Sequence, residues 1–253
     1  MLKLIKTKMK ENIQEILNEI FDPLILGDEN KVHKLTKSPS FKEIEGFAEL
    51  ILKDESEESF QFFLSQNSHF LFRLAPSSDE TYLGILMKPP ISNFNFADYA
   101  IFSVSQGGCR VLLIEIERPN DKLFTKKLTP ANKLQIALGQ INDWDEWIQS
   151  NKQTFFNTSF RLLKESPKFP KKGEKGNFIY CSKNQLEALW NGFGGNEYCT
   201  FEYLIVLGRW SKLNEREKQR LMYLNNSFSK QNIKIRTYDN LIRKSIDGPK
   251  HLW

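Results

Sequence analysis

The sequence contains little histidine and little cysteine, and it has no long hydrophobic run. Its three histidines are far apart and belong to no motif. This scarcity argues against catalysis that depends on histidine, such as Ser-His-Asp hydrolysis or HNH-type nuclease chemistry. The three cysteines show neither a CxxC pair nor Cys/His ligand spacing. The sequence therefore indicates neither a zinc knuckle nor a disulfide framework.

The lack of a long apolar run argues against a membrane-spanning helix. Residues 1–17 mix lysine with apolar residues at helical spacing. They contain no continuous apolar stretch and no cleavage site of small residues, so we do not interpret them as a signal peptide. We expect a cytoplasmic protein with no membrane partner.

Apolar and aromatic residues, by contrast, are plentiful. The chain of 253 residues is 40% hydrophobic and contains 20 Phe, which is enough for a substantial core. The net charge of +5 is compatible with a polyanionic partner. Lysines are concentrated with Pro and Gly in Lys164–Gly176, which predicts a flexible basic loop. This loop is either a solvated linker or a segment that contacts phosphate.

The hydrophobic period changes along the chain, from helical spacing near the start to the alternation of strands further on. We expect helices at 11–21, 39–54, 55–66, 128–150, 183–190, 213–228 and 237–245, and strands at 81–87, 96–104, 109–117, 177–181, 201–208 and 233–238. This order predicts an α/β fold in which helices flank a mixed β-sheet. We expect a helical extension over residues 1–54 and one further domain over residues 55–253.

The helix expected over residues 128–150 has signals at its start and along one face. Thr129 is suited to cap it, and Pro130 fits its first turn. Apolar residues at helical spacing form one stripe, which we expect to face the core: Leu134, Ile141, Trp144 and Ile148.

Two glutamates close the apolar strand "LLIEIE". Residues two apart share a face of a strand, so Glu115 and Glu117 point the same way. The strand follows a hairpin turn at "SQGG". A four-residue loop pairs Asp98 with Glu115, whereas a two-residue loop pairs Asp98 with Glu117. Both registers place the three carboxylates on one face.

Like charges on adjoining strands repel one another. The cluster is therefore either a solvated sheet edge or a site that holds a cation. Ligands that are all oxygen suit Mg²⁺, Mn²⁺ or Ca²⁺ better than zinc. A cation of this kind can orient a phosphodiester and activate water.

An ordered set of motifs resembles the Shedu nuclease domain, part of the PD-(D/E)XK nuclease superfamily. The family pattern has an acidic residue opening a strand, a hairpin, Glu-x-Lys-Arg-Pro, and a helix with Gln followed by an aromatic residue. The matching residues here are Asp98, the segment 115–119, Gln140 and Trp144. The segments "EYLIVLGRW" and "IKIRTYDNLI" are similar to the last strands of the family. The resemblance covers residues 55–245.

The resemblance implies a restriction-endonuclease-like core that hydrolyses DNA with a divalent metal, Mg²⁺ or Mn²⁺. It also implies bacterial defence against phage and homo-oligomeric assembly. In this interpretation Asp98 and Glu115 bind the metal, while Glu117 and Gln140 complete the catalytic residues.

The resemblance further implies that the helix at 55–66 can add another acidic metal ligand. Glu57 and Glu58 are both placed for this role. We favour Glu57, because it shares a helical stripe with Phe60 and Leu64.

One position departs from the family pattern. Glu117 stands where the family has a lysine, which positions the attacking water and stabilises charge on the phosphate. A glutamate there either binds metal or accepts a proton from water. The alternative is a degenerate site that binds nucleic acid and no longer cuts it.

Another cation can replace the missing lysine. The sequence offers Arg118, Lys122, Lys126 and Lys127 for this role. For contacts with the DNA backbone we expect Arg118 and the loop residues Lys171, Lys172 and Lys175. A third interpretation is an assembly protein that uses its N-terminal helices as a partner surface.

Overall fold

The computed structural model describes residues 40–53, 55–67, 69–72, 82–92, 95–105, 108–165, 187, 190–191 and 199–247. Ser38–Trp253 form one compact unit. Several predicted segments lie outside the described residues: the helix at 11–21, the strand at 177–181, most of the helix at 183–190, and nearly all of the basic loop with Lys171, Lys172 and Lys175.

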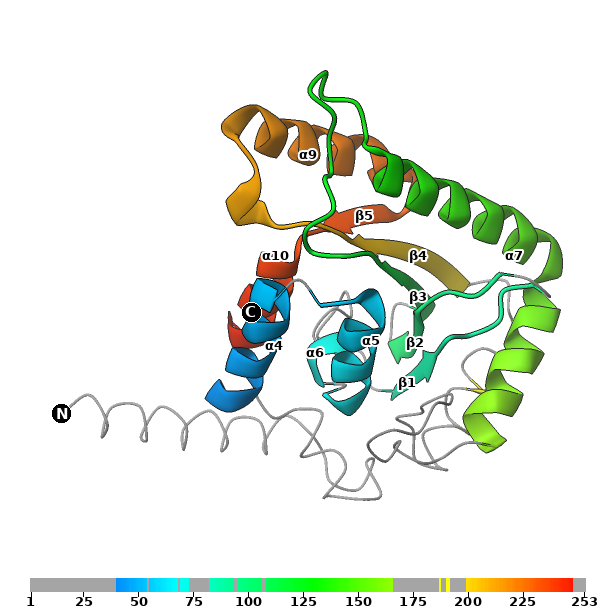
Figure 1. Ribbon diagram of the computed structural model, residues 1–253. Helices are drawn as coiled ribbons and strands as arrows, with labels where there is room; N and C mark the ends of the chain where they lie inside the picture. Colours follow the sequence, from blue (N-terminus) through cyan, green and yellow to red (C-terminus); the bar gives the residue numbers. More distant parts are fainter. Residues whose placement is uncertain are drawn as a thin grey trace. The chain divides into compact units, whose positions relative to one another are not determined.

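A five-stranded sheet forms the centre of the unit (Figure 1). Its strands follow one another in the order of the chain: β1 (Tyr82–Met87), β2 (Tyr99–Ser105), β3 (Gly108–Ile116), β4 (Cys199–Val206) and β5 (Ile233–Arg236). The first three strands are antiparallel neighbours, whereas β3, β4 and β5 run parallel. The predicted mixed sheet is confirmed.

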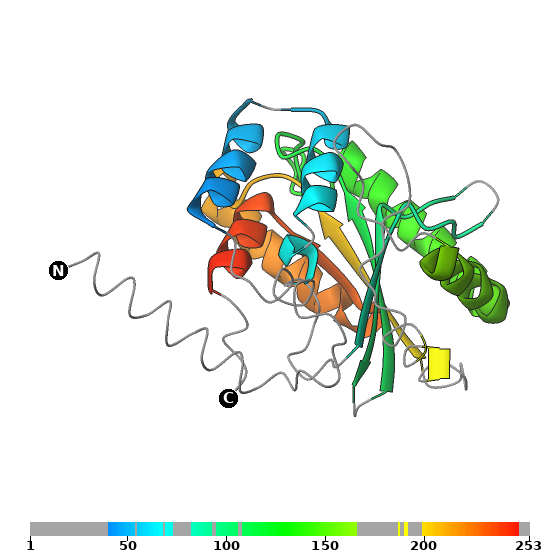
Figure 2. The ribbon, with the colours of Figure 1, turned by 90° about the horizontal axis from the view of Figure 1, so that it is seen from below.

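Helices cover both faces of this sheet, as the nearly edge-on view of the sheet in Figure 2 shows. The helical segments are α4 (Phe41–Lys53), α5 (Glu57–Gln66), α6 (His69–Phe72), α7 (Asn132–Glu165), η1 (Trp210–Lys212), α9 (Glu215–Phe228), η2 (Ser229–Gln231) and α10 (Tyr238–Asp247). The helices α7 and α9 pack on one face, and α4, α5, α6 and α10 lie on the other (Figures 1 and 2). The predicted α/β class is confirmed.

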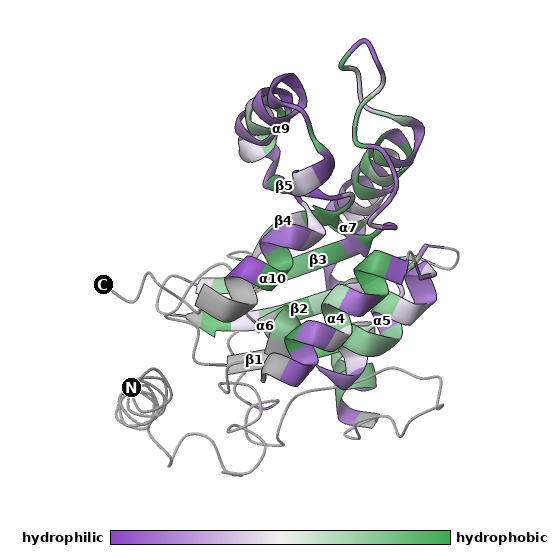
Figure 3. Cartoon of the chain, turned by 60° about the vertical axis from the view of Figure 1, so that its left-hand side comes forward, coloured by the Kyte–Doolittle hydropathy of each residue, from purple (hydrophilic) through white to green (hydrophobic). Residues whose placement is uncertain are grey.

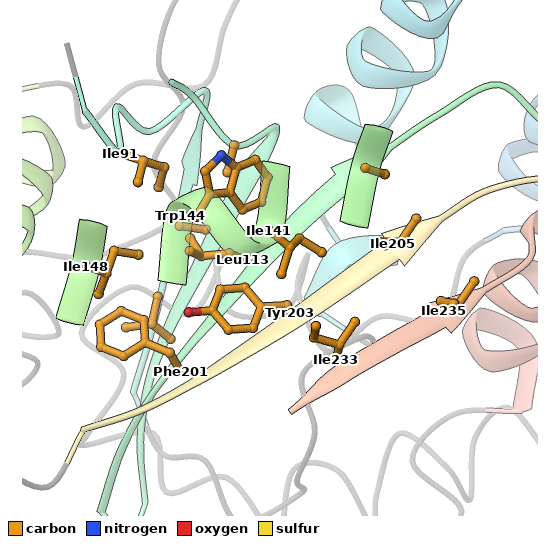
Figure 4. Packing of buried hydrophobic residues seen from close by; sticks show 14 of the residues in the cluster. Ile91, Leu113, Ile141, Trp144, Ile148, Phe201, Tyr203, Ile205, Ile233 and Ile235 are labelled. Atoms are coloured by element: carbon orange, nitrogen blue, oxygen red, sulfur yellow. The ribbon is translucent and has the colours of Figure 1, made fainter. Parts of the chain in front are cut away.

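The face under α7 and α9 contains the larger apolar cluster. Figure 4 shows Ile141 and Trp144 from α7 packed with Leu113 from β3 and Tyr203 from β4. All four of these residues are buried. The stripe predicted along this helix therefore faces the core, as expected. In Figure 3, which is coloured by hydropathy, the strands are largely hydrophobic and α9 is largely hydrophilic.

Aromatic rings join the helices on the opposite face. Phe47 of α4 stacks on Phe63 of α5, with their ring centroids 5.1 Å apart. Phe60 packs edge-on against Tyr238 of α10, with 4.9 Å between centroids. Helix α4 is thus part of the same packed unit as α5. Residues 1–39 lie outside the described residues, and the predicted domain boundary at residue 54 stays a prediction.

The hairpin between β2 and β3 has the register of the four-residue loop. Ser105 pairs with Gly108, and Tyr99 pairs with Ile114. The backbone N–H of Asp98 donates to the carbonyl of Ile114 at 3.0 Å. Of the two registers that the sequence allowed, the structure has that of the four-residue loop, whose continuation sets Asp98 opposite Glu115.

The start predicted for the long helix is wrong by a few residues. Helix α7 begins at Asn132, so Thr129 does not cap it and Pro130 is not in its first turn. Pro130 instead forms a β-bridge with Phe124, and the Thr129 carbonyl accepts from the N–H of Thr125 at 2.9 Å. These bonds close a small loop ahead of the helix.

The end predicted for this helix, at residue 150, coincides with a break in the regular helix. At Asn151 φ is −134° and ψ is 29°, and a second helical segment continues beyond this kink to Glu165. The Asn151 side chain donates to the carbonyl of Trp147 at 2.9 Å. This bond accompanies the break in the regular helical backbone.

Candidate active site

The acidic residues gather at the edge where the parallel strands end. Because β3, β4 and β5 run the same way, their carboxyl ends meet at this edge. Glu117 directly follows β3, and its N–H donates to the carbonyl of Val206 at 2.9 Å. The hydroxyl of Tyr238, at the start of α10, donates to the Glu117 carbonyl at 2.7 Å. The backbone that carries Glu117 is therefore fixed by β4 and α10.

Asp98 is held from three sides. Its Oδ2 accepts from the backbone N–H of Ile116 at 2.7 Å. Its Oδ1 accepts from Gln61 Nε2 of α5 at 2.7 Å and is also bonded by the ammonium of Lys88. Burial raises the pKa of Asp98, and the Lys88 charge and the Ile116 bond oppose this rise. The carboxylate is thus oriented by β3, α5 and the end of β1.

Lys88 follows β1 and lies opposite Asp98. Its N–H donates to the Asp98 carbonyl at 2.8 Å, which extends the β1–β2 ladder by one more pair. The backbone of Lys88 has φ of 49°, in the left-handed region. Non-glycine residues adopt this region rarely, and such residues are often found at functional sites.

Glu115 lies between Asp98 and Glu117 at the end of β3. Its side chain is buried, with the residue 9% exposed. Burial raises its pKa to about 9, and the charges of Asp98, Glu117 and Glu57 act in the same direction, against the opposing charge of Lys88. Without a further cation this carboxyl holds a proton at neutral pH.

Glu117 is paired with a lysine from α7. Lys133 Nζ donates to Glu117 Oε2 at 2.9 Å, with 5% of the Glu117 side chain and 45% of the Lys133 side chain exposed. Burial raises the pKa of Glu117, and the bond from Lys133 opposes this rise. The same bond raises the pKa of Lys133. The residue that directly follows β3 therefore takes part in an ion pair.

Of the two acids on α5, only Glu57 reaches the cluster. Ser56 caps α5 by accepting from the Ser59 N–H, and Glu57 follows in the first turn. Glu57 Oε1 accepts from Gln61 Nε2 at 2.7 Å, and the same amide donates to Asp98. Burial raises the pKa of Glu57, and the charges of Asp98 and Glu117 raise it further. Glu58 is exposed.

The remaining predicted site residues have other surroundings. Gln140 lies on α7, two turns after Lys133 on the same side of the helix. Among the described residues, nothing donates to its buried Oε1. Arg118 is exposed, next to Glu117.

Sequence reasoning missed Gln61, Lys88 and Lys133. The signal for Gln61 was its spacing of one helical turn from Glu57. The signal for Lys88 was the strand register, because the β1–β2 pairing extends to set it opposite Asp98. The position of Lys133 depended on where α7 begins, and that start was predicted too early.

Gly208 joins the two loops that border this edge. Its N–H donates to the Arg118 carbonyl at 3.3 Å, and its own carbonyl accepts from Tyr238 at 3.1 Å. Its φ is +70°, and a Cβ here would approach Leu123 Cδ1 to 2.3 Å. Only glycine fits this position without a shift of its neighbours.

The chemistry of the donor set suits a hard divalent cation, because all four acidic side chains are carboxylates. Within the described residues, no group of three or more His, Cys, Asp or Glu side chains is arranged to hold a metal ion. Lysines instead bond Asp98 and Glu117. Mg²⁺ commonly takes only one or two protein carboxylates, with water and substrate phosphate as its other ligands. Asp98 and Glu115 are the two carboxylates suited to this.

In the part of the chain that the structure covers, no helix has both the length and the apolar character needed to cross a bilayer.

A search of curated proteins found no match. The family model described as Shedu protein SduA, C-terminal, matches residues 54–242, which is most of the chain. The chain belongs to this family of Shedu defence proteins.

Proposed function

We propose that this protein is a divalent-metal-dependent endonuclease that hydrolyses DNA phosphodiester bonds in defence against phage. The observation that carries the proposal is the convergence of Asp98, Glu115 and Glu117 at the carboxyl edge of the parallel strands, with Glu57 beside them. Membership in the Shedu family supports the defence role.

In this proposal Asp98 and Glu115 hold the metal, with Mg²⁺ as the expected ion and Mn²⁺ as an alternative. Gln61 and the Ile116 N–H fix the direction of the Asp98 carboxylate. A bound divalent cation offsets the carboxylate charge and polarises the phosphate. Glu57 is placed to assist from α5, through the amide that it shares with Asp98.

Gln140 contributes a polar side chain from the helix that covers the site. Its unpartnered Oε1 is suited to accept a hydrogen bond from water or from a substrate hydroxyl. Arg118 is exposed beside the cluster and is suited to contact the DNA backbone. The predicted phosphate contacts of Lys171, Lys172 and Lys175 stay part of the proposal.

Three further parts of the proposal rest on the family resemblance and the composition. We assign the domain to the PD-(D/E)XK superfamily, with a restriction-endonuclease-like core. We expect assembly into homo-oligomers and a cytoplasmic location. The net charge of +5 favours binding of a polyanion such as DNA.

A second candidate function is a module that binds nucleic acid and no longer cuts it. The observation in its favour is Glu117, which stands where the family has its catalytic lysine. The ammonium groups of Lys88 and Lys133 also satisfy two of the carboxylates without any metal. This function predicts DNA binding that weakens steeply with salt and shows no metal-dependent cleavage.

The two functions are separated by incubating the full-length protein with supercoiled plasmid and with linear DNA in Mg²⁺ or Mn²⁺. The wild type is compared with Glu115→Gln, which keeps the size of the side chain and removes its charge. We expect cleavage by the wild type to exceed that by the variant by roughly 100-fold or more.

The matched control is Glu202→Gln on β4. Glu202 is also a largely buried glutamate of the sheet, with 14% of its side chain exposed, and it pairs with Arg110 and Lys234. This variant is expected to cut like the wild type. Equal cutting by the wild type and Glu115→Gln, or none by the wild type in either metal, contradicts the nuclease proposal.

A further inference from the structure

A lysine from another element of the fold reaches Glu117, the residue that directly follows β3. Lys133, from the first turn of α7, donates to the Glu117 carboxylate at 2.9 Å. We infer that Lys133 is the cation that contacts the substrate phosphate and that Glu117 positions it. This inference rests on the proposed function and names one of its catalytic residues.

Glu117 is a rigid anchor for such a lysine. Its backbone is bonded to Val206 on one side and to the Tyr238 hydroxyl on the other. Only 5% of its side chain is exposed, so the carboxylate has little freedom to turn. A lysine bonded to it is therefore held in one place at the edge of the sheet.

Lys133 approaches this anchor from a start of α7 that is itself fixed. The N–H of Ala131 donates to the Leu123 carbonyl at 2.9 Å, and Pro130 bridges to Phe124. The Lys133 side chain is 45% exposed. An ammonium has three protons, and the bond to Glu117 uses one of them. The others are available to an anion that approaches from solvent.

Lys88 is less suited to the same role, although it is also close to the cluster. Its ammonium bonds Asp98, which is one of the two carboxylates proposed to hold the metal. A metal on Asp98 and the Lys88 ammonium compete for the same oxygen. Lys133 bonds Glu117 instead, and so it stays positioned when Asp98 and Glu115 bind a cation.

The first test reads the contact directly and does not depend on cleavage. The full-length protein is treated with acetic anhydride, with and without a DNA duplex in Ca²⁺, and acetylation of each lysine is read by peptide mass spectrometry. We expect DNA to reduce acetylation of Lys133 by roughly tenfold, because a charge-assisted hydrogen bond must be broken first. Lys234, which is 51% exposed and paired with Glu202, is the matched control and should not change. Unchanged acetylation of Lys133 overturns the inference.

The second test moves the cation. Lys133→Gln is expected to slow single-turnover cleavage by about 100-fold and to weaken DNA binding by much less, as removal of one phosphate contact does, and Lys133→Arg is expected to slow cleavage less. Adding Glu117→Lys to Lys133→Gln returns a cation to the strand and should recover about tenfold of the rate. Lys234→Gln should cut like the wild type.

Normal cutting by Lys133→Gln, or no recovery in the double variant, overturns the assignment of Lys133 while leaving the nuclease proposal in place. A wild type that cuts no DNA overturns the nuclease proposal. In that case the acetylation of Lys133 still decides whether it contacts phosphate.

Discussion

Leu113 and Glu115 point to the same face of β3, two residues apart, and their surroundings are opposite in character. Leu113 is fully buried in the apolar cluster under α7. Glu115 is 9% exposed and is influenced by the charges of Asp98, Glu117 and Glu57. One strand therefore packs the domain along most of its length and concentrates acid at its end.

This difference separates what stabilises the fold from what the fold presents. Burial of apolar surface stabilises the domain, whereas burial of carboxylates beside one another destabilises it. The acidic end is tolerated because Lys88, Lys133 and the backbone N–H of Ile116 bond its oxygens. A destabilising cluster at the edge of a well-packed sheet is consistent with a role in binding rather than in folding.

The largest expected effect is at the apolar end. Leu113→Ala removes a fully buried side chain between α7 and the sheet and should lower the free energy of unfolding by about 2–5 kcal/mol. Urea unfolding measures this loss. Leu113→Met, which nearly keeps the volume, should lose less than about 1.5 kcal/mol. Equal losses in both variants would contradict the packing described for this face.

A smaller effect is expected at Gly208, which borders the acidic edge. Gly208→Ala places a methyl group against Leu123 and must keep a φ of +70°. We expect a loss of about 1–3 kcal/mol in unfolding free energy. Gly139→Ala is the control, because a Cβ there meets nothing within 4 Å. A neutral Gly208→Ala would show that the two loops are not tightly joined.

Glu115→Gln should raise the free energy of unfolding instead of lowering it, and the size of this effect should depend on pH. Folding raises the pKa of Glu115 from 4.5 to about 9, so the folded protein keeps a proton that the unfolded chain releases. The stability that this carboxyl contributes is complete below pH 4.5 and is lost as the pH rises towards 9.

Without metal, the stability of Glu115→Gln relative to the wild type should therefore increase by at least about 1 kcal/mol as the pH rises from 5 to 8. Melting temperatures in EDTA across this range measure the gain. A difference in stability that stays constant with pH would show that folding does not raise the pKa of Glu115.

The smallest effect is expected far from both ends of β3, at the start of α9. The Asn214 side chain accepts from the N–H of Glu217 at 3.0 Å, and the Asn214 N–H donates to the Glu217 carboxylate at 2.9 Å. Asn214→Ala should cost about 1 kcal/mol of unfolding free energy, and Asn214→Ser should retain most of the stability. Equal stability of the two variants would show that this cap is weak. Neither variant should alter cleavage.

Much of this arrangement could be predicted from the sequence. The period of the apolar residues located the described strands, and the parity of the hairpin placed Asp98, Glu115 and Glu117 together. The start of α7 could not be predicted, because Thr129 and Pro130 are held in a loop by bonds to an earlier segment, Leu123–Thr125.

The charges that balance the acids were equally hidden. Lys133 reaches Glu117 only because α7 begins at Asn132 and packs across the sheet. Sequence reasoning therefore searched for the missing cation among residues next to Glu117, in Arg118 and the following lysines. The lysine that pairs with Glu117 lies on another element, because packing across the sheet joins residues that no local pattern relates.

The most direct test of the central claim is whether the acidic edge binds a divalent cation. Melting temperatures of the wild type, Glu115→Gln and Glu202→Gln are measured at about pH 8 with increasing Mg²⁺ or Mn²⁺. Binding to the folded state alone should raise the stability of the wild type and Glu202→Gln by about 2.7 kcal/mol when the ion is at 100 times its Kd. Glu115→Gln should show no such rise. An equal rise in all three proteins, or none in the wild type, would contradict the account.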